Sequence, residues 1–187
     1  MIREAIAGRG ELVIALLRSG FEPGYANASV HEIACLGKIE TYEELEDGKY
    51  NIVVVGIHRV RILREVQHSP YQLVEVEALE EAAYDESNSE VVTRHNHLAG
   101  LFARFTELAT GTRQNALDLM SRLDFEPLVN MVVMTLNLGI EQKQALLEIN
   151  EALQRCDVLI PILQQQLETL ILVRQFEHIK SENPNLN

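Results

Sequence analysis

Residues 36–62 read LGKIETYEELEDGKYNIVVVGIHRVRI, and this stretch decides the fold of the first half of the chain. The pair Asp47-Gly48 lies between two segments that are rich in apolar residues. Because glycine tolerates the positive φ of a tight turn, the pair predicts two antiparallel strands joined near residue 48. Beyond the turn, Val60 and Ile62 alternate with arginines, which is typical of a strand with one buried face.

Further strands are predicted on both sides of this hairpin. The apolar run at residues 12–17 predicts a short buried strand, and residues 74–78 alternate as in a half-buried strand. Ser69-Pro70 predicts a turn between the last two strands. We expect Arg59, Arg61 and Arg64 to pair with Glu75 and Glu77 across the sheet. Several short strands at close spacing favour an antiparallel sheet or small barrel over residues 1–82, with the end of a helix at residues 2–8.

The second half has helical periodicity. Residues 83–90 form an acidic linker, in which Ser87 and Glu90 have the spacing of a capping box and predict a helix start at 88–91. Apolar residues recur at helical spacing from 98 to 109, and Gly111 is a plausible stop. Residues 128–138 are apolar almost all round, so they predict a central helix that is capped by Asp124 and ended by Gly139.

The last predicted helices are residues 141–149 and a long one that ends near Ile179. Pro161 leaves two alternatives for the long helix. Either Asp157 caps it and Pro161 lies near its first turn, or it starts near Glu151 and is kinked at the proline. We favour the second. The prediction is thus an α+β chain, with a helical bundle at residues 91–180 and a frayed tail at 181–187.

Composition and charge narrow the possible functions. The chain has 187 residues, of which 47% are hydrophobic, and its 16 basic against 28 acidic residues give a net charge of −12. Residues 1–90 carry 17 of the acidic residues and 8 of the basic ones. This balance argues against nucleic-acid binding, because phosphate binding depends on lysine and arginine. The start has no signal-peptide core, and the most apolar stretch is interrupted by polar residues and too short to span a membrane. We therefore expect a cytoplasmic protein whose two distant cysteines, Cys35 and Cys156, are reduced.

No pattern in the sequence predicts a catalytic residue, a metal or a cofactor. Gly37-Lys38 is followed by isoleucine and does not complete a phosphate loop. His95 and His97 would diverge on a helix, since residues two apart point in different directions. A Cys35–His58 dyad has no supporting motif. The sequence does not identify a substrate-binding residue. Possible surface anchors are Tyr42, Tyr50 and Ile57, although each also fits a role in packing.

Part of the first half resembles a known family. The order of Cys35-Leu-Gly-Lys-Ile39, Asp47-Gly48, Tyr50 and the segment from Gly56 to Ile62 is similar to the N-terminal, substrate-binding domain of Lon proteases. In the second half, Gln144-Ala-Leu-Leu-Glu148, followed by Arg155 and a long helix, is similar to the helical part of that domain. The resemblance implies a PUA-like antiparallel sheet or barrel followed by a helical bundle.

The resemblance also implies a function. In Lon proteases this domain engages unfolded or damaged polypeptides and helps the enzyme to assemble, whereas the ATPase and Ser-Lys peptidase modules lie further along. Neither of those motifs occurs here, so the chain resembles a stand-alone, non-enzymatic, ATP-independent binding module. Its expected partners are unfolded polypeptides or a separate protease or chaperone. The alternatives are a self-assembly or scaffold domain that forms homo-oligomers and an RNA-binding domain by analogy with PUA-like sheets. A further alternative is a small hydrolase with an unrecognised site, which bound metal or a reactive Cys35 would indicate.

Two departures from the family pattern stand out. Ala34 occupies a position where the family often has glycine. Met1-Ile2 resembles residues that follow the family's opening Leu-Pro-rich strand and its Phe-Glu-Pro-Arg-Tyr-like segment, which Phe21–Tyr25 imitates further along. We therefore expect the family's first strand to be lacking and one edge of the sheet to be exposed, and such edges readily pair with other chains.

Overall fold

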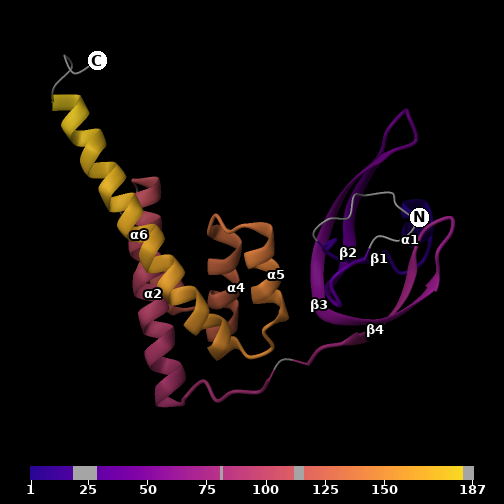
Figure 1. The fold of residues 1–187 in the computed structure, drawn as a ribbon, viewed down its shortest axis with the longest axis horizontal. Coiled ribbons are helices and arrows are strands. Elements are labelled where there is room, and N and C mark those ends of the chain that lie inside the picture. The colour runs from indigo at the N-terminus through magenta and orange to yellow at the C-terminus, as the bar shows by residue number, and fades with distance from the viewer. Residues whose placement is uncertain (19–28, 81, 112–115, 183–187) are drawn as a thin grey trace. The chain divides into compact units, whose positions relative to one another are not determined.

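A computed structural model describes residues 1–18, 29–80, 82–111 and 116–182 (Figure 1). The chain divides into two compact units, Met1–Glu80 and Glu81–Asn187. Among the described residues, the strands lie in the first unit, here called the β unit, and the long helices lie in the second, the helical unit. The prediction of an antiparallel sheet followed by helices is confirmed. The residues of the Phe21–Tyr25 segment lie outside the described part of the chain.

The described residues of the β unit form one helix and four strands. They are α1 (Ile2–Ala7), β1 (Glu11–Ile14), β2 (Ile33–Glu44), β3 (Tyr50–Gln67) and β4 (Leu73–Ala78). The sheet order is β1-β2-β3-β4, and every neighbouring pair is antiparallel. The predicted turn at Ser69-Pro70 joins β3 to β4.

The hairpin between β2 and β3 forms at the predicted residues. Gly48 has a φ of +78°, in the left-handed region that favours glycine. The backbone N–H of Leu45 donates to the carbonyl of Lys49 at 2.8 Å, and the Lys49 N–H donates to Oδ1 of Asp47 at 3.1 Å. Local chemistry therefore fixes where these two strands turn and how they pair next to the turn.

Strand β3 is long enough to pair with two neighbours. It lies against β2 along residues 50–61 and against β4 along residues 60–67. The register shifts leave one extra residue on β2, Glu40, and three on β3, Ile57, Leu63 and Val66. Such bulges bend a strand and increase its twist. The sheet curves accordingly in Figure 1.

The predicted strand over residues 12–17 forms only in part and is not buried. Strand β1 ends at Ile14, whose side chain is 53% exposed, and Leu17 makes only an isolated bridge with Val30. A run of apolar residues marks a buried strand only where both faces are covered, and β1 is an edge strand with half-buried residues.

The arginines of β3 have different neighbours. Arg64 makes the predicted pair with Glu75, with 2.6 Å between Nε and Oε2, and Arg61 lies opposite Glu77 in the register. Arg59 is instead opposite Cys35 and nearly buried. Both members of the Arg64–Glu75 pair are exposed, so it contributes little to stability.

The helical unit is built around one apolar core. Its helices are α2 (Ser89–Thr110), α3 (Ala116–Ser121), α4 (Phe125–Thr135), α5 (Ile140–Glu148) and α6 (Ala152–Glu182). The largest fully buried side chains come from α2, α4 and α6 and from the segment after α4: Leu98, Phe102, Phe125, Leu128, Leu136, Leu159 and Leu163. Helix α3 was not predicted from the sequence.

Helix α2 begins where predicted but with a different cap. The Oδ1 of Asn88, not a Ser87 oxygen, accepts from the backbone N–H of Glu90 at 2.8 Å. Ser87 instead donates its hydroxyl to Asp85 at 2.7 Å. The helix ends at Gly111, with a φ of +71°, as expected.

Helix α4 begins after Asp124, but side chains from the preceding segment serve its first turn. The N–H of Phe125 donates to Oε1 of Glu86 at 3.3 Å, and that of Glu126 donates to the Tyr84 hydroxyl at 3.2 Å. The Tyr84 ring packs edge-on against Phe125, with 5.7 Å between ring centroids. These contacts join residues 84–86 to the bundle.

The prediction that Gly139 ends this helix was wrong. Helix α4 ends at Thr135, and Gly139 is the N-cap of α5. Its backbone N–H donates to Oε1 of Gln142 at 3.0 Å, as expected for the residue that begins a helix. Leu136 and Leu138 are nevertheless buried, so the apolar pattern of the sequence continues past the end of the helix and does not show where the helix ends.

Helix α6 starts at Ala152, close to the start expected in the favoured alternative, and contains Pro161. Residues Ala152–Phe176 are long and apolar enough, by length and composition alone, to cross a membrane. However, Leu159 and Leu163 of this segment are fully buried in the bundle, and core helices of soluble proteins pass the same test. Arg94 of α2 pairs with Asp157 of α6, with 2.7 Å between Nε and Oδ1. A membrane protein is therefore not indicated.

Candidate polypeptide-binding surface

Strand β3 presents a row of exposed aliphatic side chains, Val53, Val55 and Ile57, which we call the β3 row. Their side chains are 54%, 49% and 40% exposed. Val53 and Val55 are alternate residues and therefore lie on one face of the strand, and Ile57 is the extra residue of a bulge that continues the row. Adjacent exposed aliphatic side chains of this kind are typical of interaction surfaces.

The backbone beside this row has a neighbour on one side only. Residues 50–59 of β3 pair with β2, whereas pairing with β4 begins at Val60. Within residues 1–18, 29–80, 82–111 and 116–182, no other strand pairs with β3 before Val60. The first half of β3 is therefore a sheet edge, although β3 is a central strand along its second half.

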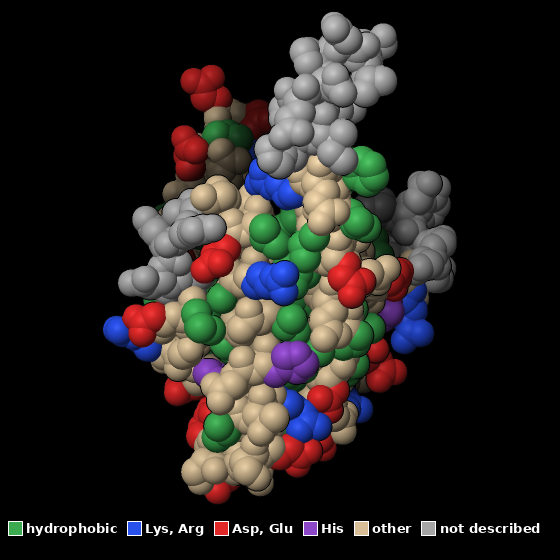
Figure 2. Space-filling view, turned by 90° about the vertical axis from the view of Figure 1, so that its left-hand side faces the viewer, with side chains coloured by type: hydrophobic (Ala, Val, Ile, Leu, Met, Phe, Trp, Pro, Cys, Tyr) green, Lys and Arg blue, Asp and Glu red, His purple; other side chains and the backbone are tan. Residues whose placement is uncertain are grey.

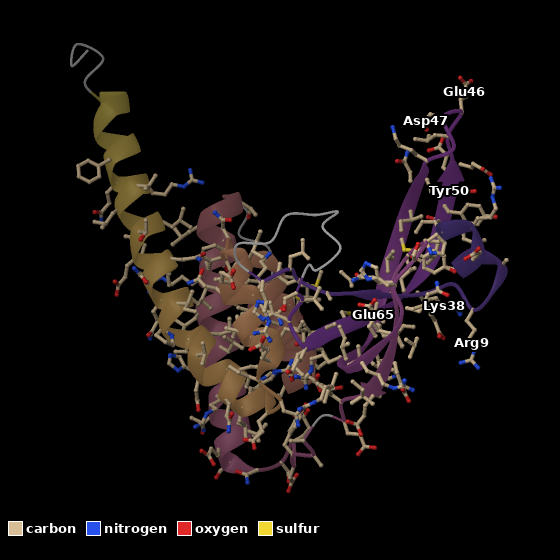
Figure 3. All side chains as sticks on the ribbon, turned by 45° about the vertical axis from the view of Figure 1, so that its right-hand side comes forward. Arg9, Lys38, Glu46, Asp47, Tyr50 and Glu65 are labelled. Atoms are coloured by element: carbon tan, nitrogen blue, oxygen red, sulfur yellow. The ribbon has the colours of Figure 1, made fainter. Side chains whose placement is uncertain are left out.

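The hairpin that carries the row is acidic. Residues 40–51 contain five carboxylates and one lysine, a net charge of −4. Glu46 and Asp47 project from the hairpin tip, away from Tyr50 (Figure 3). Lys49 lies 2.6 Å from Asp47 and lowers the pKa of that carboxyl. In the described part of the chain, ion pairs on this hairpin involve Glu44 and Asp47, and not Glu40 or Glu46.

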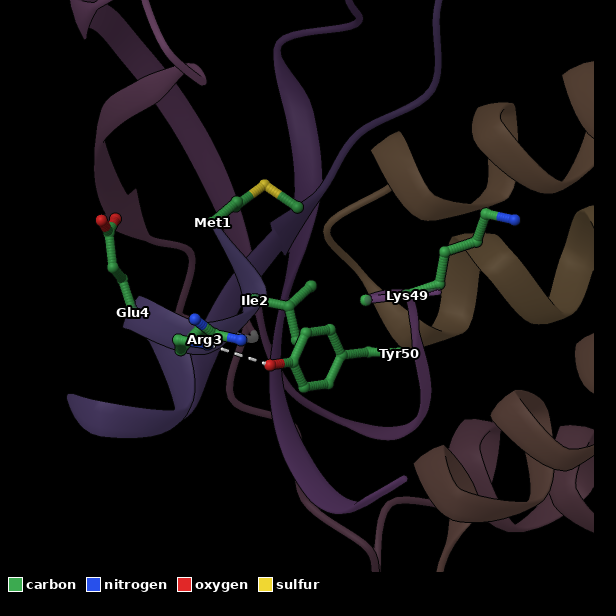
Figure 4. A pocket seen from close by; sticks show the side chains of 7 residues that line it. Met1, Ile2, Arg3, Glu4, Lys49 and Tyr50 are labelled. Atoms are coloured by element: carbon green, nitrogen blue, oxygen red, sulfur yellow. Dashed lines mark hydrogen bonds between the residues drawn. The ribbon is translucent and has the colours of Figure 1, made fainter. Parts of the chain in front are cut away.

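Helix α1 contacts the other face of the same hairpin. The Arg3 guanidinium donates to the Tyr50 hydroxyl at 3.2 Å (Figure 4). It also donates to Oε1 of Glu44 at 2.7 Å. The Tyr50 hydroxyl and the Arg3 guanidinium together lower the pKa of Glu44. Glu4 accepts a hydrogen bond from Tyr71, which lies in the turn before β4. Helix α1 thus links two turns of the sheet.

A hollow of about 660 Å³ lies between α1 and the hairpin turn. Its walls are residues 1–4 and 48–50 (Figure 4). The polar groups that face it from Arg3 and Tyr50 already bond to each other. This hollow therefore offers fewer unused polar groups than the exposed edge of β3.

The three anchors considered from the sequence have different positions. Ile57 belongs to the β3 row, whereas Tyr50 bonds to Arg3. Tyr42 is 55% exposed, and its ring lies 6.4 Å from that of Tyr50 at an angle of 54°. It lies opposite Ile52 in the register and so on the other face from Val53. Sequence reasoning missed Val53 and Val55, because the run Ile-Val-Val-Val does not show which alternate residues are exposed.

The residues considered for chemistry are not brought together. Cys35 lies opposite Arg59 and Leu36 opposite His58, so the Cys35 and His58 side chains leave the strands on opposite faces. Burial raises the pKa of the Cys35 thiol, and it raises that of Cys156 to about 12. Both thiols are therefore poor nucleophiles near neutral pH.

Of the two histidines of α2, His95 packs within the helical bundle. Nε2 of His95 lies 2.8 Å from the carbonyl oxygen of Leu123, and its ring lies 6.5 Å from that of Phe125. Over the described residues, no group of three or more His, Cys, Asp or Glu side chains could hold a metal ion. The structure thus assigns His95 to the bundle.

The helical unit has a second surface of interest. A groove of about 510 Å³ lies between α2, α5 and α6, and uncharged residues line it, including Phe105, Gln142, Ile162, Gln166 and Leu170. Beyond it, Leu172, Val173 and Phe176 of α6 are 54%, 47% and 66% exposed. On the face that carries α6, hydrophobic side chains gather in the middle and are interspersed with polar ones (Figure 2).

Known proteins resemble both the sequence and the fold. Residues 1–165 match the family model of the ATP-dependent protease La (LON) substrate-binding domain. The chain is 32% identical over 149 residues to the Lon protease of Citrifermentans bemidjiense and 29% identical over 156 residues to Lon protease 1 of Bdellovibrio bacteriovorus. These matches cover 76% and 79% of this chain but 18% and 19% of those proteins. The chain thus spans about one fifth of the length of these relatives.

Solved structures give the same fold. The N-terminal domain of the Mycobacterium avium complex Lon protease matches with a TM-score of 0.66 at 23% identity, over 87% of this chain and 82% of that one. A Lon N-terminal domain protein from Xanthomonas campestris matches with a TM-score of 0.59 at 20% identity, over 86% and 80%. Since the family model covers both the sheet and most of the bundle, the chain belongs to the Lon substrate-binding domain family.

Proposed function

We propose that this chain is a non-enzymatic, cytoplasmic module that binds unfolded or damaged polypeptides at the β3 row. One observation carries the proposal: Val53, Val55 and Ile57 are exposed side by side on a strand with an unpaired edge. Membership of a substrate-binding family supports the same function. Folded proteins bury most of their large aliphatic side chains, so such a surface distinguishes unfolded clients from folded ones.

Recognition would combine apolar burial with long-range attraction. Water released from aliphatic surfaces drives binding without demanding a particular client sequence. The acidic hairpin would attract clients with exposed lysine and arginine, mainly by raising the association rate. Clients captured in this way would pass to a protease or chaperone. Association that is equally fast at high and at low salt would contradict the electrostatic part.

A binding titration tests the proposal. Fluorescence anisotropy compares a labelled, permanently unfolded polypeptide with its folded counterpart. We expect the unfolded form to bind at least tenfold more tightly. The double variant Val53→Thr/Val55→Thr keeps residues that suit strands but removes aliphatic surface, so it should weaken binding severalfold.

The matched control is Leu172→Gln in the helical unit. Leu172 is as exposed as Val53, at 54%, so the change removes a comparable surface elsewhere in the chain. We expect client binding to be unchanged. Equal binding of unfolded and folded polypeptide by the unaltered protein would contradict the proposed function.

Self-assembly is the second candidate, because the exposed end of α6 favours it. Leu172, Val173 and Phe176 are exposed apolar residues close together on a helix whose apolar residues are not confined to one face. Sedimentation velocity over a hundredfold range of concentration measures association. If this surface joins copies of the chain, Phe176→Gln should shift the protein toward monomer, whereas Val53→Thr should not.

A further inference from the structure

We propose that the client binds as an added β-strand on the free edge of β3, between Asn51 and His58. This inference rests on the proposed function and goes further, because it specifies the client's conformation and sequence. The client's backbone would complete the sheet where β4 does not reach, and its alternate side chains would lie against the β3 row. The bound segment would be about eight residues long, to match the length of the free edge.

The backbone argument comes from the strand pairing. Along an edge, alternate residues direct both their N–H and C=O groups away from the existing partner. Residues 50–59 of β3 have β2 on one side, and among the described residues their other side makes no backbone hydrogen bond before the contact from the Leu79 N–H to the Arg59 carbonyl. An extended backbone satisfies these groups with matching spacing, whereas a helix does not, because its own groups are already paired.

The side-chain argument comes from the period of the row. Val53 and Val55 project from one face at the two-residue spacing of a strand. A client strand in the same sheet would place its own alternate residues beside them, at the separation at which aliphatic cross-strand pairs are stabilising. Clients with β-branched or aromatic residues at alternate positions should therefore bind best.

The charge of the hairpin specifies the residues that flank this core. Five carboxylates and one lysine lie within residues 40–51, and Glu46 and Asp47 stand at the tip (Figure 3). The residues that flank a client strand beside β3 would lie near this tip. Lysine or arginine at that end of the client would be attracted, and aspartate or glutamate would be repelled. The occupant is thus an extended segment with alternate aliphatic residues and a basic flank.

Backbone methylation tests this mode directly. The probe is a labelled peptide with four valines alternating with threonines and two lysines at each end. Two further peptides carry N-methyl groups, one on all the valines and the other on all the threonines. Only alternate N–H groups of an added strand face its neighbour, so we expect one methylated peptide to bind at least tenfold more weakly than the other.

Hydrogen exchange locates the added strand. Binding of the unmethylated peptide should slow exchange of outward-facing N–H groups between residues 51 and 58, with no comparable protection in α6. A glutamate-flanked peptide should bind several times more weakly than the lysine-flanked one at low salt. The difference should shrink as salt is added.

The outcomes separate this inference from the proposed function. If both methylated peptides bind as tightly as the parent while unfolded protein is still preferred, strand addition is overturned and the proposed function stands. If protection appears in α6 rather than at residues 51–58, the edge assignment is wrong. If neither the peptides nor the unfolded protein bind, the proposed function fails as well.

Discussion

The β unit and the helical unit differ in how completely they cover their apolar residues. The buried hydrophobic side chains of the described β unit are Ile33, Ala34, Ile39 and Val60, whereas sixteen buried residues form a single cluster in the helical unit. The β unit leaves Val53, Val55 and Ile57 exposed along one strand. The comparison teaches that most of the stabilising burial lies in the unit that is not proposed to bind clients. Apolar side chains that stay exposed for binding cannot also be buried in the core.

The largest expected effect is the loss of a core aromatic in the helical unit. Phe125 is fully buried and packs against Tyr84 and His95, so Phe125→Ala should lower the free energy of unfolding by about 3–5 kcal/mol. Urea denaturation measures the change. Phe176→Ala, at a position 66% exposed, serves as the control and should be nearly neutral. A loss below about 1 kcal/mol at Phe125 would break the comparison.

Matched glycine substitutions should have opposite signs in the two units. A Cβ at Gly37 would lie 2.4 Å from Cγ1 of Val54 and 3.3 Å from the Val55 carbonyl, so Gly37→Ala should destabilise the β unit by about 1–3 kcal/mol. A Cβ at Gly100 of α2 meets no atom within 4 Å, so Gly100→Ala should stabilise the helical unit by about 0.5–1 kcal/mol. Thermal unfolding followed separately for strand and helix signals measures both. The same sign at both positions would contradict the packing described for β2 and β3.

A smaller effect is expected where residues 84–86 meet the bundle. Tyr84→Phe removes the hydroxyl that accepts from the Glu126 N–H but keeps the ring against Phe125. The loss should be about 1 kcal/mol, the usual net contribution of one hydrogen bond. Amide hydrogen exchange at Glu126 should quicken while exchange in β3 stays unchanged. Tyr84→Ala, which also removes the ring, should cost more.

The smallest effect concerns the contact between α1 and the hairpin. Because Tyr50 and Arg3 lower the pKa of Glu44 in the folded protein, this group stabilises the fold above its ordinary pKa, near 4.3. That contribution is lost as the pH falls through the lowered value. Carboxyl titration by NMR should give a Glu44 midpoint below that of an ordinary glutamate. Arg3→Met should raise it, and an unchanged midpoint would show that the contact does not persist in solution.

Features with a local chemical cause could be predicted from the sequence. Asp47-Gly48 fixed the hairpin because the turn itself requires a residue with positive φ, and Gly111 ended α2 for the same reason. Asn88 is the N-cap of α2, where the sequence suggested Ser87. Both residue types can cap a helix, and the backbone conformation at the helix start decides which of two neighbours does so. This error moves the helix cap by one residue and leaves the fold unchanged.

Features that depend on tertiary neighbours could not be predicted. The bulges at Ile57, Leu63 and Val66 arise from the register of three strands, which no local pattern encodes. Of the candidate surface, Ile57 was found and Val53 was not, since exposure depends on where β4 begins to pair. Likewise, the end of α4 at Thr135 was hidden by Leu136 and Leu138, which are buried without being helical.

The bulges of β3 have a consequence for aggregation. Fibrils grow when flat edges stack strand upon strand with one repeating geometry. The extra residues Ile57 of β3 and Glu40 of the adjoining β2 bend and twist the sheet at this edge, so a strand added beside residues 51–58 would lie on a curved support. A further chain would meet a different curvature and would pair less well with it. The same irregularities would therefore let the sheet accept one unfolded segment without acting as a seed for many.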